Sequence, residues 1–144
     1  MAIPALNKNG ELPPGEHRTT VQELEATFGT STPKRQELVQ KLKTALSNFK
    51  AAGVPKVWID GSFTTTKPEP ADIDGVCDFV HKTDITKLDP VFLDASGTDA
   101  QKNKYGLDFY PNVIEGGTGL PFPKFFQENR DGNPKGILVI EVQI

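Results

Sequence analysis

Apolar and polar residues alternate regularly between Thr32 and Gly53. Lysine and glutamine separate apolar side chains that recur every three or four positions, which is the spacing of one face of an α-helix. These apolar side chains are Leu38, Leu42, Ala45, Leu46 and Phe49. Thr32 suits the N-cap, Pro33 suits the first turn, and Gly53 and Pro55 end the pattern. We therefore predict an amphipathic helix over residues 32–52 whose apolar face packs in the core.

The residues before this helix divide into two parts. Thr20 and Glu23 form a capping box, which predicts a short helix that ends at Gly29. Residues 1–18 show no periodicity and contain Pro-Pro-Gly, so we expect an irregular N-terminal arm. We expect residues 19–144 to form a single domain, because a chain of this length can bury a genuine core.

Four runs rich in β-branched and aromatic residues predict strands. They cover residues 56–60, 73–81, 106–110 and 136–144. Between the strands we expect two short helical pieces, capped by Asp89 and Thr98, and a helical turn at 123–128. The predicted fold class is α/β (α+β), with a small mixed central sheet and helices packed on it.

The composition is that of an ordinary globular chain, with 36% hydrophobic and 24% charged residues. A formal net charge of -3 argues against a protein that coats DNA or RNA, but it leaves room for a local basic pocket. Cys77 has no second cysteine for a disulfide or a zinc site, so we expect it in the core. The sequence lacks the pattern of a signal peptide or a transmembrane helix, and we expect a cytoplasmic protein with no membrane partner.

The stretch VWIDGSFTTTKPEPADIDGVCDFV places two aspartates at the start of a strand. Asp72 and Asp74 point to one side because side chains alternate along a strand. Two carboxylates this close repel each other unless a cation lies between them, and Mg²⁺ prefers carboxylates together with substrate phosphates. Gly61 lets the backbone approach a phosphate, to which Ser62 can donate. This arrangement predicts a site for a metal-bound triphosphate; the alternative is that the two aspartates only solvate an edge strand.

The order of these features resembles the nucleotidyltransferase superfamily with the polymerase-beta-type fold. The shared pattern is a strand, a Gly-Ser turn, a short connection and an Asp-x-Asp pair, here within residues 57–80. The segments DGSF, DID, AQKNKYG and FFQENRDGNPKG also resemble a small group of stand-alone predicted nucleotidyltransferases. The resemblance implies a nucleotidyltransferase-like fold and an enzyme that requires Mg²⁺ or Mn²⁺.

Such an enzyme moves a nucleoside monophosphate from an NTP to a hydroxyl on a protein or an RNA end. The resemblance further implies a toxin–antitoxin or defence setting. The short chain leaves little room for a separate acceptor-recognition domain, so a partner chain or a homo-dimer could supply one. The alternative is a non-catalytic module that keeps this fold and acts by binding protein or nucleotide.

A two-metal mechanism needs a third carboxylate to activate the attacking hydroxyl, and Asp108 is the best candidate. Its neighbours Leu107 and Phe109 alternate to one face of a short strand and leave Asp108 on the other. Glu141 in the final strand and Asp78 farther along the second strand are the competing choices. We therefore expect Asp108 to bind the metal and to carry catalysis with the Asp-x-Asp pair.

Several basic residues are candidates for contact with the triphosphate. Many superfamily members carry an arginine soon after the Gly-Ser, whereas the connection FTTTKPEP holds only a lysine. The expected nucleotide contacts are Gly61, Ser62, Lys67 and Lys104. Further candidates are Lys102, Arg130 and Lys135.

Overall fold

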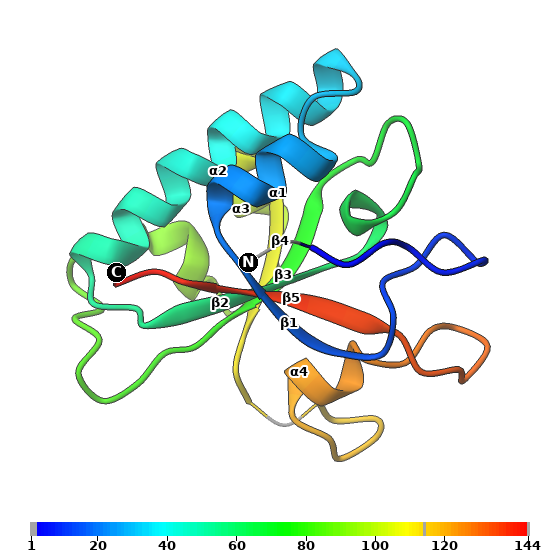
Figure 1. Cartoon of the computed structure of the whole chain (residues 1–144). Helices are drawn as coiled ribbons and strands as arrows, with labels where there is room; N and C mark the ends of the chain where they lie inside the picture. The colour runs from blue at the N-terminus through cyan, green and yellow to red at the C-terminus, as the bar shows by residue number, and fades with distance from the viewer. Residues whose placement is uncertain (1–2, 114, 144) are drawn as a thin grey trace.

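The computed structural model describes residues 3–113 and 115–143 and is built around a five-stranded sheet (Figure 1). The strands follow the order β1-β5-β2-β3-β4. Their bounds are β1 Gly15–Thr19, β2 Lys56–Asp60, β3 Ile73–Cys77, β4 Leu107–Pro111 and β5 Gly136–Glu141. β2 runs antiparallel to β5 and β3, whereas β1 is parallel to β5 and β4 is parallel to β3. The expected α+β class with a mixed sheet is confirmed.

Helices lie on both faces of this sheet (Figure 1). Their bounds are α1 Val21–Phe28, α2 Pro33–Ala51, α3 Asp99–Tyr105 and α4 Phe122–Phe125. Helices α1, α2 and α3 bury the main apolar cluster, to which Ile73 and Leu107 of the sheet contribute. The other face carries a smaller cluster around Trp58 and Val76, with Phe122 and Phe126 beside it. Among the described helices, none has the length and apolar character needed to cross a lipid bilayer.

Hydroxyl caps begin the first two helices as the sequence predicts. The side chain of Thr20 accepts a hydrogen bond from the backbone of Glu23 at 3.1 Å. The side chain of Thr32 accepts one from the backbone of Arg35 at 3.2 Å. Each cap satisfies a backbone N–H that has no partner within its helix. Two 3-10 turns, η1 Ser62–Thr64 and η2 Pro90–Leu93, lie between the strands.

The prediction of an irregular arm over residues 1–18 is wrong for the last part of that range. Gly15–Thr19 forms β1, which pairs with β5 in a register from Gly15↔Gly136 to Thr19↔Ile140. The strand exists because the far end of the chain supplies its hydrogen-bond partner, which no local pattern reveals. Met1 and Ala2 lie outside the described residues.

Two predicted strands are shorter than expected. β3 ends at Cys77 rather than at residue 81, because Cys77 is opposite Val57 near the start of β2. The backbone of Asp78 still donates to the carbonyl of Lys56 at 3.2 Å, and beyond it the chain leaves the sheet. The final strand ends at Glu141, and residue 144 lies outside the described residues.

A glutamine of α3 closes the outer edge of β4. The Gln101 side chain, which is 2% exposed, donates to the carbonyl of Phe109 at 2.9 Å and accepts from its N–H at 2.8 Å. The backbone of an edge strand would otherwise lack these partners. The pair fixes α3 against β4, and it holds the next residue of α3, Lys102, near Asp108 at the start of the strand.

Candidate functional site

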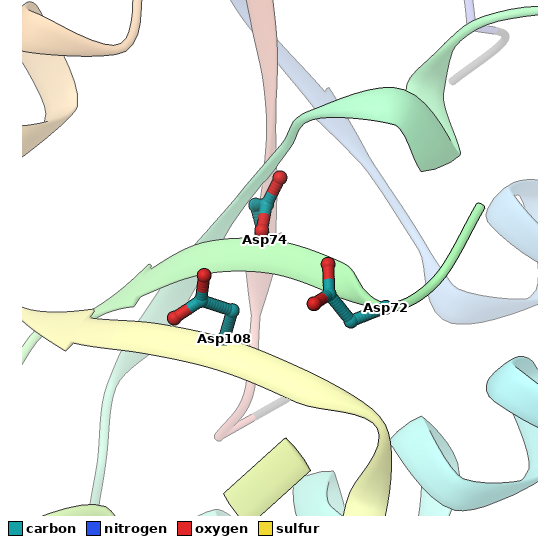
Figure 2. A group of neighbouring side chains, drawn as sticks. All are labelled: Asp72, Asp74 and Asp108. Atoms are coloured by element: carbon teal, nitrogen blue, oxygen red, sulfur yellow. The ribbon is translucent and has the colours of Figure 1, made fainter. Parts of the chain in front are cut away.

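Three aspartates meet on the face of the sheet that α1, α2 and α3 leave uncovered. Asp72 directly precedes β3, while Asp74 of β3 and Asp108 of β4 are partners in the parallel ladder. One carboxylate oxygen of each lies within 4.8 Å of the others, and Figure 2 shows them gathered on the neighbouring strands. The structure therefore brings together the three carboxylates that the sequence singles out.

The negative charge of the three carboxylates exceeds the positive charge of the side chains around them. The pKa of Asp74 is raised to about 8, first by burial and then by the charges of Asp72 and Asp108. The Oδ1 atom of Asp108 is buried and has no hydrogen-bond partner among the described residues. Lys102 lies at the rim, with its Nζ 3.8 Å from Asp108 Oδ2, and this carboxylate raises the pKa of Lys102. Oxygen ligands in this arrangement fit a hard divalent cation.

The two competing carboxylates lie at the opposite end of the sheet. Glu141 is opposite Lys56 in the ladder between β2 and β5, and it pairs with Arg18 at 3.1 Å. Asp78 follows the last residue of β3 and accepts a hydrogen bond from Asn112 at 3.1 Å. Neither joins the three-carboxylate cluster.

Gly61 is required by the carboxylate cluster itself. Its φ of 81° lies in the left-handed region that favours glycine. A Cβ atom at this position would meet Oδ2 of Asp74 at 1.9 Å. The carboxylate of Asp74 therefore occupies the space that a side chain would fill, which explains why the turn after β2 begins with glycine.

A buried arginine that the sequence analysis did not identify shapes the turn after Gly61. Arg35 of α2 is 2% exposed, and its guanidinium lies 5.0 Å from the ring centroid of Phe63. It donates hydrogen bonds to the carbonyls of Phe28, Ser62, Phe63, Thr65 and Lys67. Because these carbonyls turn inward to one cation, the segment 62–67 has a defined shape. In the sequence, Arg35 looks like any other polar residue of an amphipathic helix.

A cleft of about 810 Å³ lies beside the carboxylates. One wall is the turn after β2, with Gly61, Ser62 and Lys67, and the cleft also reaches Asp74. The rest of the lining includes residues of α4 and of the loop before β5, among them Arg130. One wall of the cleft thus contains three of the expected nucleotide contacts, namely Gly61, Ser62 and Lys67. Asp74 belongs both to the lining of the cleft and to the carboxylate cluster.

A buried ion pair lies at the base of this cleft. Asp60, at the end of β2, is 4% exposed and is opposite Asp74 in the ladder between β2 and β3. Burial raises the pKa of Asp60, and the adjacent Lys135 ammonium opposes that rise. The Nζ atom of Lys135 lies 2.5 Å from Oδ1 of Asp60. Lys135 is therefore the candidate cation that the fold holds most firmly at this site.

Lys104 is directed elsewhere, contrary to the sequence prediction. Its Nζ lies 2.5 Å from Oδ2 of Asp89, and the hydroxyl of Tyr105 donates to the same oxygen at 2.6 Å. Residues two positions apart on a helix point in different directions, so Lys102 rather than Lys104 reaches the carboxylates. Lys104 therefore binds Asp89 and is not part of the cleft lining.

Comparison with known proteins places the chain in a family. A family model described as "Family of unknown function (DUF6932)" matches residues 4–141. Neither the curated proteins nor the solved structures contain a match. The matched range includes the three carboxylates and both walls of the cleft. Because the match spans far more than half of the chain, the protein belongs to the DUF6932 family.

Proposed function

We propose that this protein is a nucleotidyltransferase that requires Mg²⁺ or Mn²⁺ and transfers a nucleoside monophosphate from an NTP to a hydroxyl. The observation that carries the proposal is the convergence of Asp72, Asp74 and Asp108 within 4.8 Å of one another. The Gly-Ser turn between β2 and β3 lies beside them at the mouth of a cleft. This arrangement, together with the resemblance of residues 57–80, supports a nucleotidyltransferase-like fold.

The chemistry of the cluster fits a divalent cation. Burial, followed by repulsion from its neighbours, raises the pKa of Asp74, and Asp108 has a buried oxygen without a partner among the described residues. A cation shared by these oxygens would relieve both conditions. When bound, Mg²⁺ or Mn²⁺ would neutralise charge on the substrate phosphates and on the leaving group.

Each residue at or near the cluster would have a separate role in the proposed reaction. Asp72, Asp74 and Asp108 would hold the metal, while the Ser62 hydroxyl and the Lys67 and Lys135 ammonium groups would orient the triphosphate. The acceptor oxygen attacks the α-phosphorus, the bond to the β-phosphate oxygen breaks, and pyrophosphate leaves. Asp108 would accept the proton of the acceptor hydroxyl.

The acceptor in this proposal is a protein side chain or an RNA end. The NTP would fill the cleft, whose lining includes Asp74 but neither Asp108 nor Lys102, so the acceptor would approach past these two residues, which pair with each other. A partner chain or a second copy of the protein would supply further acceptor contacts, and a toxin–antitoxin or defence setting would suit such a modifying enzyme.

Labelling in cell lysate tests this function. The protein is incubated with each labelled NTP and Mn²⁺ or Mg²⁺, and labelled macromolecules are sought. We expect transfer by the parent and by Asp78→Asn, a matched control just beyond β3, and none by the double variant Asp72→Asn/Asp74→Asn. If the parent labels nothing and its thermal melt does not move with metal and any NTP, the protein is a non-catalytic binding module instead.

A further inference from the structure

The cleft differs in chemistry from one wall to the other. The wall formed by Gly61, Ser62 and Asp74 is polar and adjoins the carboxylate cluster. The part of the lining that comes from α4 and the loop before β5 carries the aromatic side chains of Phe125 and Phe126 next to charged and polar residues that include Glu128 and Arg130. A ligand that fits both walls has an anionic, metal-binding part and a flat apolar part, which describes a nucleotide.

Phe125 differs from the aromatic residues next to it. Phe122 and Phe126 pack against the small apolar cluster around Trp58. Phe122 also stacks on Tyr110, with ring centroids 5.0 Å apart at 15°. Phe125 is half-buried, lines the cleft and is absent from that cluster. Its ring makes edge contacts with Phe122 and Phe126, at centroid distances of 6.1 and 5.2 Å. The small apolar cluster therefore accounts for the burial of Phe122 and Phe126, whereas Phe125 contacts it through these two rings and lines the cleft.

The loop beyond α4 gives this wall a fixed shape. The side-chain oxygen of Asn129 accepts from the backbone of Asp131 and Asn133 at 3.0 and 2.9 Å. Its amide nitrogen lies 3.3 Å from a carboxylate oxygen of Glu11. Hydrogen bonds within the loop and to the N-terminal segment thus hold this part of the cleft lining in place, so it needs little ordering when a ligand binds.

We propose that the ring of Phe125 stacks on the base of the nucleotide whose phosphates lie at Gly61 and Ser62. This inference rests on the proposed function and adds the part of the cleft that recognises the nucleoside. Stacking on an aromatic ring tolerates every base, because each base has a π face. The site therefore prefers nucleoside triphosphates over inorganic triphosphate, with weak discrimination among bases.

Calorimetric titration with two probes separates the two ends of the cleft. ATP and inorganic triphosphate are each titrated with Mn²⁺ into the full chain and into three variants. In Phe125→Ala we expect ATP to bind roughly tenfold more weakly or worse, as loss of one stacking contact implies, while triphosphate affinity stays unchanged. Phe125→Tyr keeps the ring and should bind ATP like the parent. Phe122→Ala is the matched control, an aromatic of the same helix that does not line the cleft, and it should retain the preference for ATP.

The outcomes distinguish failure of this inference from failure of the proposed function. If the parent binds triphosphate and ATP equally well, or if Phe125→Ala binds ATP like the parent, the stacking role is wrong and the polyphosphate site stands. An equal loss of both probes in Phe125→Ala would also overturn the stacking role, because it would show a structural effect. If the parent binds neither probe, the proposed function fails and this inference fails with it.

Discussion

Replacement of Asp74 with asparagine should change how the stability of the metal-free protein depends on pH. The pKa of Asp74 in the folded protein is raised to about 8 by burial and by Asp72 and Asp108, whereas an aspartate in an unfolded chain ionises near pH 3.9. Between about pH 4 and pH 8 the folded state therefore binds more protons than the unfolded state. The free energy of unfolding contributed by this group then falls as the pH rises through that window.

The size of the effect follows from the shift in pKa. One pKa unit corresponds to about 1.4 kcal/mol, so the full shift would amount to about 6 kcal/mol at high pH. Asp74 is only half-buried, and solvent and salt screen its repulsion, so we expect about 2 kcal/mol. For a chain of this length, that difference corresponds to about 6 °C in Tm.

Thermal melts in a metal chelator at about pH 5, 7 and 9 measure this effect. Asp74→Asn keeps the shape of the side chain, so we expect it to match the parent at about pH 5 and to be more stable at about pH 9. Asp78→Asn should follow the parent at every pH. Added Mn²⁺ should stabilise the parent at about pH 8 but not Asp74→Asn. If parent and Asp74→Asn lose stability equally between pH 5 and 9, the raised pKa of Asp74, and with it the effect of burial and repulsion at this cluster, is wrong.

Three further substitutions test the supports of the site, each by urea unfolding. Gly61→Ala should destabilise the protein by about 2 kcal/mol or more, because residue 61 has a positive φ and the added Cβ would collide with the carboxylate of Asp74. An unchanged midpoint of urea unfolding would contradict this expectation. Arg35→Met should lower the free energy of unfolding by at least about 3 kcal/mol, because it leaves several carbonyls unpaired. Amide hydrogen exchange in residues 62–67 should become faster in this variant. Unchanged exchange there would show that Arg35 does not shape the turn. Lys135→Met should lower the free energy of unfolding by about 3–5 kcal/mol, because it leaves Asp60 buried without its cation. Adding Asp60→Asn to this variant should restore most of the lost stability. If it restores none, the broken ion pair is not the cause of the loss.

Local patterns in the sequence were sufficient for several parts of this protein. The period of apolar residues and the cap at Thr32 identified α2, because helical hydrogen bonds and packing faces depend on residues three and four apart. Alternation along strands placed Asp72 and Asp74 on one face and separated Asp108 from Leu107, because the side-chain period of a strand is two. These features depend on neighbours in the chain and so can be read from it.

Other features depend on partners distant in the chain, and the tertiary structure decided them. β1 is a strand because β5 pairs with it, and no periodicity in residues 1–18 predicts that partner. Lys135 reaches Asp60 across 75 positions, and the guanidinium of Arg35 reaches the carbonyl of Lys67 across 32. The sequence shows that these charged residues exist, but burial and pairing arise only when β2, β5 and α2 pack together. The sequence by itself thus determined α2 and the side of the sheet on which the carboxylates lie, because both follow from local periodicity, while strand pairing and packing decided β1 and which charges meet at the cleft.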